Sequence, residues 1–325
     1  MAEQVNHVDN EIKFVLHWII YCPVMGKFRY HIYGNLMILN TNKRTPVKHG
    51  IVTALRRVIS LALVFIFICF GFLTACTTNT TVQYADNPIA GRETLTQIST
   101  IDAILNGVYD GVVTYGVLKG YGDFGIGTFK ALDGEMLAFD SVFYQIKADG
   151  IAYVVADEME TPFASMTFFD ADYSGNLPQG LDFTQLQEYL DSILPSENEF
   201  YAIKIEGTFS YMKTRSVPAQ EKPYPPLVEV TKNQPVFEFE NVAGTLVGFR
   251  SPPYVAGVNV PGYHLHFLTA DKKAGGHVLD FIIEQADVAI DYTADFMMIL
   301  PGEGSDFYRI DLTPNKHEEL EQAEK

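Results

Sequence analysis

Three histidines in one short segment are the residues of this sequence best suited to chemistry. His264 and His266 lie two apart in GYHLHF (262–267), and His277 follows a turn-like stretch, DKKAGG (271–276). Alternate residues of a strand share a face, so both imidazoles project together, and a β-hairpin can return His277 beside them. Three imidazoles directed at one point form the ligand set of a catalytic metal site. We predict zinc, with manganese, iron or nickel as other divalent metals that such a site accepts.

Two charged residues are weaker candidates for the same chemistry. Glu135 follows the turn Leu132-Asp133-Gly134 and is either a base beside the metal or a solvated carboxylate at the start of a strand. Arg215 ends the extended segment Phe200–Val217, where we expect it on the same face as Ile203; an arginine there can clamp a carboxylate. The Gly-rich stretch Gly120–Gly127 lacks the Lys-Ser/Thr of a phosphate loop, and we interpret it as a tight backbone wall.

The elements that must position these residues are mostly strands. Capped amphipathic patterns predict helices near 101–108 and 183–193, and the tail 315–325 is a charged helix or a frayed end. Short alternating or β-branched runs predict the strands, at 135–139, 142–146, 151–155, 164–169, 200–217, 236–239, 245–249, 263–268, 278–283 and 296–300. The predicted fold is α+β, with two mixed β-sheet subdomains, few helices and the metal site on a β-hairpin of the C-terminal half. We place the subdomains at 98–217 and 236–325, joined by a Pro-rich connection at 218–235.

The N-terminal quarter resembles a leader. An apolar run of 16 residues (58–73) follows Arg56-Arg57 and ends at Leu73-Thr74-Ala75-Cys76, which is typical of a lipoprotein signal with Cys76 as the lipidation site. A retained membrane helix is the alternative, although the run is short for one. We therefore expect a signal peptide at 51–75 and a tether at 76–97. Residues 1–50 would be an extension that results from a start codon assigned too early, or alternatively a genuine one. The protein would be lipid-anchored to the outer face of the cell membrane, or else secreted or cytoplasmic.

Composition narrows the function further. The 325 residues hold 23 Lys and Arg against 40 Asp and Glu, and a formal net charge of −17 argues against a nucleic-acid partner. Neither of the other two cysteines follows Cys76, and only four of the eight histidines do. The chemistry after Cys76 must therefore use histidine, carboxylates, arginine or the backbone.

Taken together, these motifs resemble the bacterial alpha-acetolactate decarboxylase family. The matching segments, in family order, are STIDA (99–103) to Gly111, GDFGIGTF (122–129), LDGEM (132–136), TRSV (214–217), GYHLHF (262–267) and Gly276-His277. The resemblance implies decarboxylation of 2-acetolactate, a small 2-hydroxy-3-keto acid, to acetoin and carbon dioxide. It implies zinc held by the three histidines with Glu135 and Arg215 beside it, and no organic cofactor.

The resemblance also implies a glutamate from the C-terminal tail. Four residues compete for this role, and Glu324 is favoured by its place near the end; the others are Glu318, Glu319 and Glu321. Thr128 in the second motif is a candidate for substrate binding. Exposed sheet edges make a homodimer an open expectation.

Two other kinds of protein remain open from the residues alone. One is a different metalloenzyme on a β-scaffold, such as a cupin-like dioxygenase or isomerase, in which His-x-His pairs are also common. The other is a non-enzymatic lipoprotein that binds a metal or a solute. Such a binder would lack an arginine and a carboxylate facing an open metal position.

Overall fold

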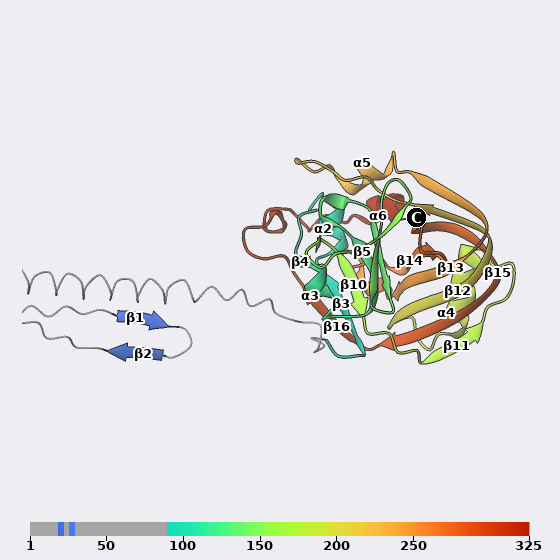
Figure 1. The fold of residues 1–325 in the computed structure, drawn as a ribbon, viewed down its shortest axis with the longest axis horizontal. Coiled ribbons are helices and arrows are strands. Elements are labelled where there is room, and N and C mark those ends of the chain that lie inside the picture. Colours follow the sequence, from blue (N-terminus) through green and yellow to red (C-terminus); the bar gives the residue numbers. More distant parts are fainter. Residues whose placement is uncertain (1–18, 23–25, 30–89, 325) are drawn as a thin grey trace, which may run out of the picture. The chain divides into compact units, whose positions relative to one another are not determined.

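The computed structural model describes residues 19–22, 26–29 and 90–324, in two units divided at Thr80/Thr81 (Figure 1). In the first unit, β1 (Ile19–Cys22) and β2 (Gly26–Arg29) pair as an antiparallel hairpin. The predicted signal peptide (51–75), Cys76 and the first part of the tether lie outside the described residues. Among the residues described, no helix is long and apolar enough to cross a membrane.

Two β-sheets form the second unit. The seven-stranded sheet has the order β16-β3-β10-β5-β6-β7-β8, in which only the β16–β3 pair is parallel. Its strands are β3 (Thr94–Ile98), β5 (Phe124–Thr128), β6 (Glu135–Phe139), β7 (Val142–Ile146), β8 (Ala152–Val154), β10 (Ala164–Thr167) and β16 (Asp295–Ile299). A small separate pair joins β4 (Val113–Thr114) to β9 (Glu160–Thr161).

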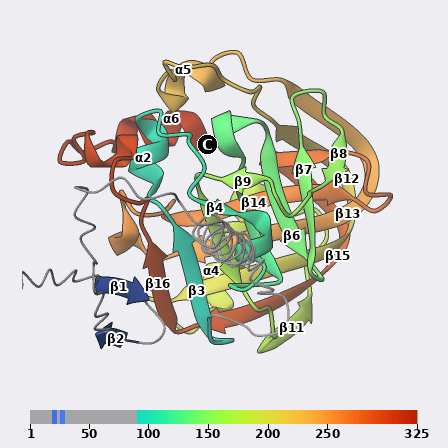
Figure 2. The same ribbon diagram turned by 60° about the vertical axis from the view of Figure 1, so that its left-hand side comes forward.

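The five-stranded sheet carries the long strands. Its order is β11-β15-β12-β13-β14, and a further pairing of β14 with β15 closes the last four strands into a ring. The strands are β11 (Tyr173–Asn176), β12 (Phe200–Arg215), β13 (Val236–Ser251), β14 (Gly262–Thr269) and β15 (Gly275–Thr293). Figure 2 shows the strands of the seven-stranded sheet in front of these long strands.

The main core lies between the two sheets. Leu95, Phe124 and Leu137 from one sheet pack against Phe249 and Leu268 from the other, and all five are buried. The opposite face of the five-stranded sheet is covered by α4 (Phe183–Ile193), which begins at an Asp182 capping box. The outer face of the other sheet packs against α3 (Tyr115–Leu118).

Three helices gather at one end of this core. They are α2 (Ile101–Leu105), α5 (Leu227–Thr231) and α6 (His317–Glu324), and their apolar residues form one cluster (Figure 2). Single 3-10 turns occur at Lys130–Leu132, Pro253–Val255 and Asp306–Tyr308. The C-terminal helix is therefore packed against the fold, which brings Glu324 at its end close to the two sheets.

The α+β class with few helices is confirmed, but the predicted subdomains do not match the sheets. β12 precedes the connection at 218–235 and pairs with β13 and β15, which follow it. β16, near the C-terminus, pairs with β3 at the start of the unit. A long strand presents hydrogen-bonding groups along both edges, and here segments from the other side of the Pro-rich connection satisfy them. That connection therefore links neighbouring strands of one sheet.

Three strand predictions need correction. Residues 94–97, predicted as tether, belong to the buried strand β3. This segment can be polar and still be buried, because Gln97 Oε1 accepts hydrogen bonds from Ser165 Oγ (2.7 Å) and Asn259 Nδ2 (2.9 Å) inside the fold. The strands predicted at 236–239 and 245–249 are one strand, β13, because the polar residues between them stay paired with β12. The strand predicted at 278–283 extends over 275–293.

A bulge also changes the face on which Arg215 lies. Ile203 and Met212, an odd number of residues apart, both pack in the cluster with α4, whereas a regular strand would place them on opposite faces. Ser210 has no partner in β15, and the register shifts on both sides of Phe209. As a result Arg215 faces the seven-stranded sheet, on the side opposite to Ile203.

Candidate functional site

The strand register places the predicted site residues in one row. His277 of β15 is paired with Arg215 of β12 on one side and with His266 of β14 on the other. His264 lies two residues before His266 on β14. The residues that alternate with this pair pack on the α4 side, so both imidazoles point into the space between the sheets.

Two glycines allow the strands that carry His277 and Glu135 to approach their neighbours closely. Gly276 has a φ of +140°, and a Cβ there would lie 2.3 Å from the carbonyl oxygen of Arg215, so β15 can approach β12 only without a side chain. Gly134 has a φ of +95°, and a Cβ there would lie 2.3 Å from the carbonyl oxygen of Ile146. The first glycine directly precedes His277, and the second directly precedes Glu135 at the start of β6.

The three histidines are held as a metal-binding set. One ligand nitrogen from each lies within 4.8 Å of the others, and His264 Nε2 is 3.2 Å from His277 Nδ1. His266 Nδ1 lies 2.7 Å from the carbonyl oxygen of Met136, and His277 Nε2 lies 3.1 Å from that of Glu324. A carbonyl only accepts, so each of these nitrogens is the N–H donor, and the other ring nitrogen keeps its lone pair.

Electrostatics favours the same protonation state. Burial, together with the positive charge of Arg215, lowers the pKa of His264 to about 3. Burial also holds the pKa values of His266 and His277 well below their usual range. Within the described part of the chain, His266 Nε2 is buried without a hydrogen-bond partner. Neutral imidazoles that can each offer a nitrogen lone pair are what a divalent metal requires, so the residues fit one.

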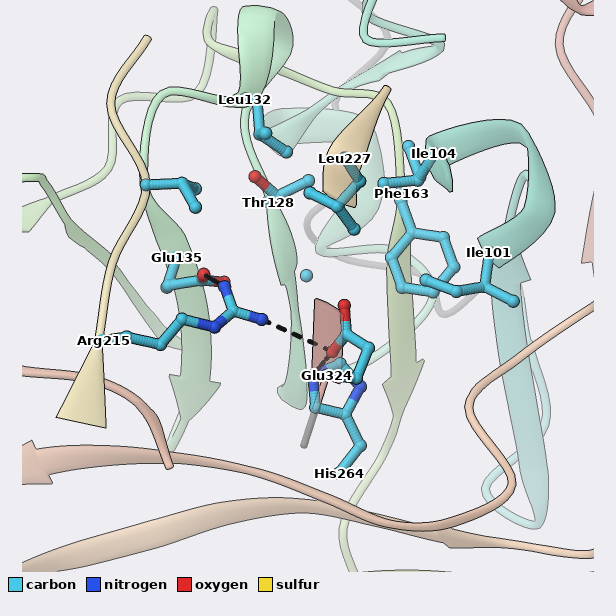
Figure 3. Close-up of a pocket in the computed structure, with 12 residues that line it drawn as sticks. Ile101, Ile104, Thr128, Leu132, Glu135, Phe163, Arg215, Leu227, His264 and Glu324 are labelled. Atoms are coloured by element: carbon cyan, nitrogen blue, oxygen red, sulfur yellow. Dashed lines mark hydrogen bonds and ion pairs between the residues drawn. The ribbon is translucent and has the colours of Figure 1, made fainter. Parts of the chain in front are cut away.

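Arg215 lies between two buried glutamates beside this set (Figure 3). Its Nη1 donates to Glu135 Oε1, and its Nη2 donates to the carbonyl oxygen of Ala323 (3.0 Å) and lies 3.6 Å from Glu324 Oε2. The arginine side chain is 3% exposed. A guanidinium presents its donors in a fixed fork, which suits this double contact.

Both glutamates reach the histidines as well. Glu135 Oε2 is 3.5 Å from His266 Nε2, and Glu324 Oε2 is 3.4 Å from His264 Nε2. Burial raises the pKa of Glu135 to about 7 and also raises the pKa of Glu324, while Arg215 opposes both shifts. Two carboxyl groups with raised pKa values therefore lie against the metal-binding nitrogens, and Glu135 can hold a proton near neutral pH.

Of the four tail glutamates proposed from the sequence, Glu324 is the one that enters the site, with its side chain 6% exposed. Glu319 instead pairs with Lys316 at 2.7 Å, and Glu318 is exposed. The helix α6 positions Glu324 by burying Leu320 and Ala323 on its inner side. The tail is therefore part of the site.

The remaining wall of the cavity is apolar. It lies over Glu135, Arg215, His264 and Glu324, and it is formed by Ile101, Ile104, Leu132, Phe163, Val217 and Leu227, with Gly127 and Thr128 beside them (Figure 3). Thr128 Oγ1 donates to the carbonyl oxygen of Gly134 (2.7 Å), so its proton is already engaged in the turn before β6. Only its lone pairs remain available to a ligand.

Sequence reasoning missed the main-chain part of the site. The carbonyl oxygens of Met136, Ala323 and Glu324 fix the orientations of His266, Arg215 and His277. Any residue type supplies a carbonyl, so no sequence signal could have identified these three contacts. The apolar lining did have a signal, because the amphipathic pattern of α2 indicates a buried face.

Comparisons with known proteins agree with this geometry. Residues 95–314 match the sequence model of the family described as alpha-acetolactate decarboxylase. The chain is 58% identical over 233 residues to alpha-acetolactate decarboxylase of Methanosarcina mazei, covering 72% of this chain and 81% of that protein. It is 43% identical over 229 residues to that of Bacillus subtilis strain 168 (70% and 89%). The crystal structure of the strain 168 protein superposes with a TM-score of 0.69 at 42% identity, covering 71% of this chain and 99% of that one.

Proposed function

The chain belongs to the alpha-acetolactate decarboxylase family, and from that premise we propose that it converts 2-acetolactate to acetoin and carbon dioxide in the cavity between its two sheets. The observation that carries the proposal is the row His266–His277–Arg215, which faces Glu135 and Glu324 under an apolar wall. A solute-binding site has no need of an arginine held between two carboxyl groups at the metal-binding face.

The reaction needs an electron sink and a proton. The bond between the carboxylate carbon and C2 breaks, its electron pair moves into the neighbouring ketone, and C2 then takes up one proton. A divalent metal bound by His264, His266 and His277 supplies Lewis acidity toward the substrate oxygens. We favour zinc because three imidazoles with a position left for substrate are typical of catalytic zinc.

The chain's own residues supply the other functions. Arg215 is already buried and directed into the cavity, so it can bind the substrate carboxylate as a charge-assisted pair. Glu135 or Glu324 can hold the proton that C2 receives, because both carboxyl groups are buried next to the histidines. The apolar wall limits water around the reacting carbon.

A matched pair of histidine variants tests the proposal. His266→Ala removes a central ligand, whereas His317→Ala removes an exposed histidine of the same chain. We expect His266→Ala to lose both bound metal and acetoin formation, and His317→Ala to keep both. Metal content is measured by mass spectrometry of the purified protein, and acetoin is measured after addition of racemic 2-acetolactate. Full acetoin formation by a metal-free His266→Ala would contradict the proposal.

We also propose that Cys76 carries a lipid that anchors the enzyme to the outer face of the cell membrane. The support is the run of apolar residues at 58–73 between an arginine pair and Cys76. Mass spectrometry of the membrane fraction should find a lipid-modified N-terminal Cys76. An intact N-terminus at Met1 would contradict the anchor.

A homodimer is a further proposal. The edge strands β8 and β16 of the seven-stranded sheet expose apolar side chains, among them Val154 (73%) and Met298 (41%). Exposed edges and apolar patches favour association with a second chain. Light scattering after size-exclusion chromatography should give twice the mass of one chain, and a monomer at micromolar concentration would contradict the proposal.

A further inference from the structure

A second group of ligand-type residues lies at another part of the fold. Glu93, Asp172 and Asp291 each offer a carboxylate oxygen, and these oxygens all lie within 4.8 Å of one another. Glu93 directly precedes β3, Asp172 directly precedes β11, and Asp291 lies on β15. The group therefore joins the seven-stranded sheet to the five-stranded sheet, fourteen residues along β15 from His277.

Asp291 is the member of this group that needs an explanation. It is 2% exposed, and its Oδ2 has no hydrogen-bond partner among the described residues. A buried carboxylate oxygen without a partner is costly, because it loses its hydration and gains no hydrogen bond in return. The three other carboxylates nearby, of Glu93, Asp172 and Asp170, add repulsion; burial and this repulsion raise the pKa of Asp291 to about 7, against a backbone hydrogen bond from Asp170.

Backbone hydrogen bonds hold the segments that carry these carboxylates next to one another. The N–H of Asp172 donates to the carbonyl oxygen of Ile290 (2.9 Å), and the N–H of Tyr292 donates to Asp172 Oδ2 (2.8 Å). The N–H of Asp295 donates to the carbonyl oxygen of Glu93 (2.9 Å). Asp172 is thus tied to the residues on both sides of Asp291, so these two positions are fixed relative to each other.

The donor set indicates which ion fits. Three carboxylate oxygens without nitrogen or sulfur favour a hard cation. Calcium accepts oxygen ligands in a flexible geometry, whereas magnesium demands a near-ideal octahedron, so carboxylates from three separate segments favour calcium. The three oxygens lie within 4.8 Å of one another, which is close enough for one ion to bind them all. The neighbouring Arg92 lies 3.8 Å from Asp170, and both side chains are about 70% exposed, so this pair remains at the surface.

We propose that Glu93, Asp172 and Asp291 bind a calcium ion that links the two sheets, independently of the histidine site. The ion would neutralise the buried Asp291 carboxylate and complete its coordination with water on the exposed side. Calcium should therefore raise the melting temperature, because it binds the folded chain and not the unfolded one.

Terbium luminescence tests the site directly. Terbium replaces calcium on oxygen ligands, and Tyr173 and Tyr292, which adjoin Asp172 and Asp291 in the chain, can sensitise its emission. The full chain, first loaded with zinc, is titrated with terbium and then with calcium or magnesium; calcium binding is measured separately by calorimetry. We expect sensitised emission that calcium displaces and magnesium displaces at least tenfold less effectively.

Variants assign the site to its residues. Asp291→Asn should weaken calcium binding at least tenfold and abolish the calcium-dependent rise in melting temperature. Glu284→Gln removes an exposed carboxylate from the same strand and should change neither. If Asp291→Asn does not fold, Asp172→Asn gives the same test at an exposed ligand. Wild-type calcium affinity in these variants, no calcium binding at millimolar concentration, or equal displacement by magnesium would each overturn the proposal.

Discussion

Replacement of Arg215 by alanine separates the role of the arginine in catalysis from its role in folding. The guanidinium is the cation between Glu135 and Glu324, and it also donates to the carbonyl oxygen of Ala323 at the end of α6. Its removal leaves two buried carboxyl groups without a positive partner. We expect His266 and His277 to stay in place, because the carbonyl contacts that orient them do not involve Arg215.

The expected magnitudes follow from this geometry. Breaking a buried ion pair costs about 3–5 kcal/mol of unfolding free energy. Here we expect the lower end, because Glu135, with a pKa raised to about 7, can take up a proton instead of remaining charged. For a domain of this size that is a fall in melting temperature of about 6–12 °C. Loss of a group that binds a reacting carboxylate lowers kcat/KM by about 10²–10³.

Arg250→Ala is the matched control. Arg250 is also buried (5% exposed), lies 3.3 Å from Asp191 Oδ1, and belongs to the same sheet, but it does not line the cavity. We expect it to lower the melting temperature by less, because the Asp191 side chain is 40% exposed, and to leave turnover of the folded enzyme unchanged.

The assay is acetoin release per folded chain, with folding followed by circular dichroism and metal content by mass spectrometry. Arg215→Ala should keep its metal and lose turnover. Arg215→Lys retains the positive charge without the paired N–H donors of the guanidinium, and it should lose less turnover. A folded, metal-loaded Arg215→Ala enzyme with wild-type turnover would refute the role that we give to the arginine.

Three further predictions concern other parts of the site. Glu135→Gln should keep the metal and lower kcat by about 10²–10⁴, measured in single-turnover acetoin assays; an unchanged kcat would remove Glu135 from the proton transfer. Deletion of 323–325 should lower turnover at least tenfold, whereas Glu318→Gln, an exposed change in α6, should not; equal activities would show that the tail is dispensable. Gly127→Ala places a Cβ 2.4 Å from the carbonyl oxygen of Phe163 and should destabilise the fold by about 1–3 kcal/mol in a denaturant titration, whereas Gly302→Ala, with nothing within 4 Å, should not.

The elements that the sequence predicted best are those with a complete local signal. The strands 135–139 and 142–146 and the helix 183–193 have the predicted bounds, because their alternation or capping is contained in a few residues. Strand β3 was missed because its polar side chains are satisfied by partners far away in the sequence. The predicted subdomain boundary was wrong because β12 pairs with strands on the other side of the Pro-rich connection, and no local pattern in the sequence shows which distant strands will pair.

The site shows the same division between local and long-range information. The histidine cluster was predictable, since two of its members are adjacent on a strand and the third is one hairpin away. The face of Arg215 was not, because a bulge at Ser210 reverses the alternation. The choice of Glu324 among the tail glutamates depends on how α6 packs, and the carbonyl contacts depend on the backbone alone.

In the proposed reaction, this chain decarboxylates 2-acetolactate by means of a metal held by its three buried histidines. The most direct test uses 2-acetolactate labelled with ¹³C at the carboxylate, given to the full chain as purified, after chelation, and after zinc is restored. We expect labelled carbon dioxide and unlabelled acetoin in equal amounts above the spontaneous rate, loss of both on chelation, and recovery of both with zinc. Product formation at the spontaneous rate, or full activity in the metal-free protein, would contradict it.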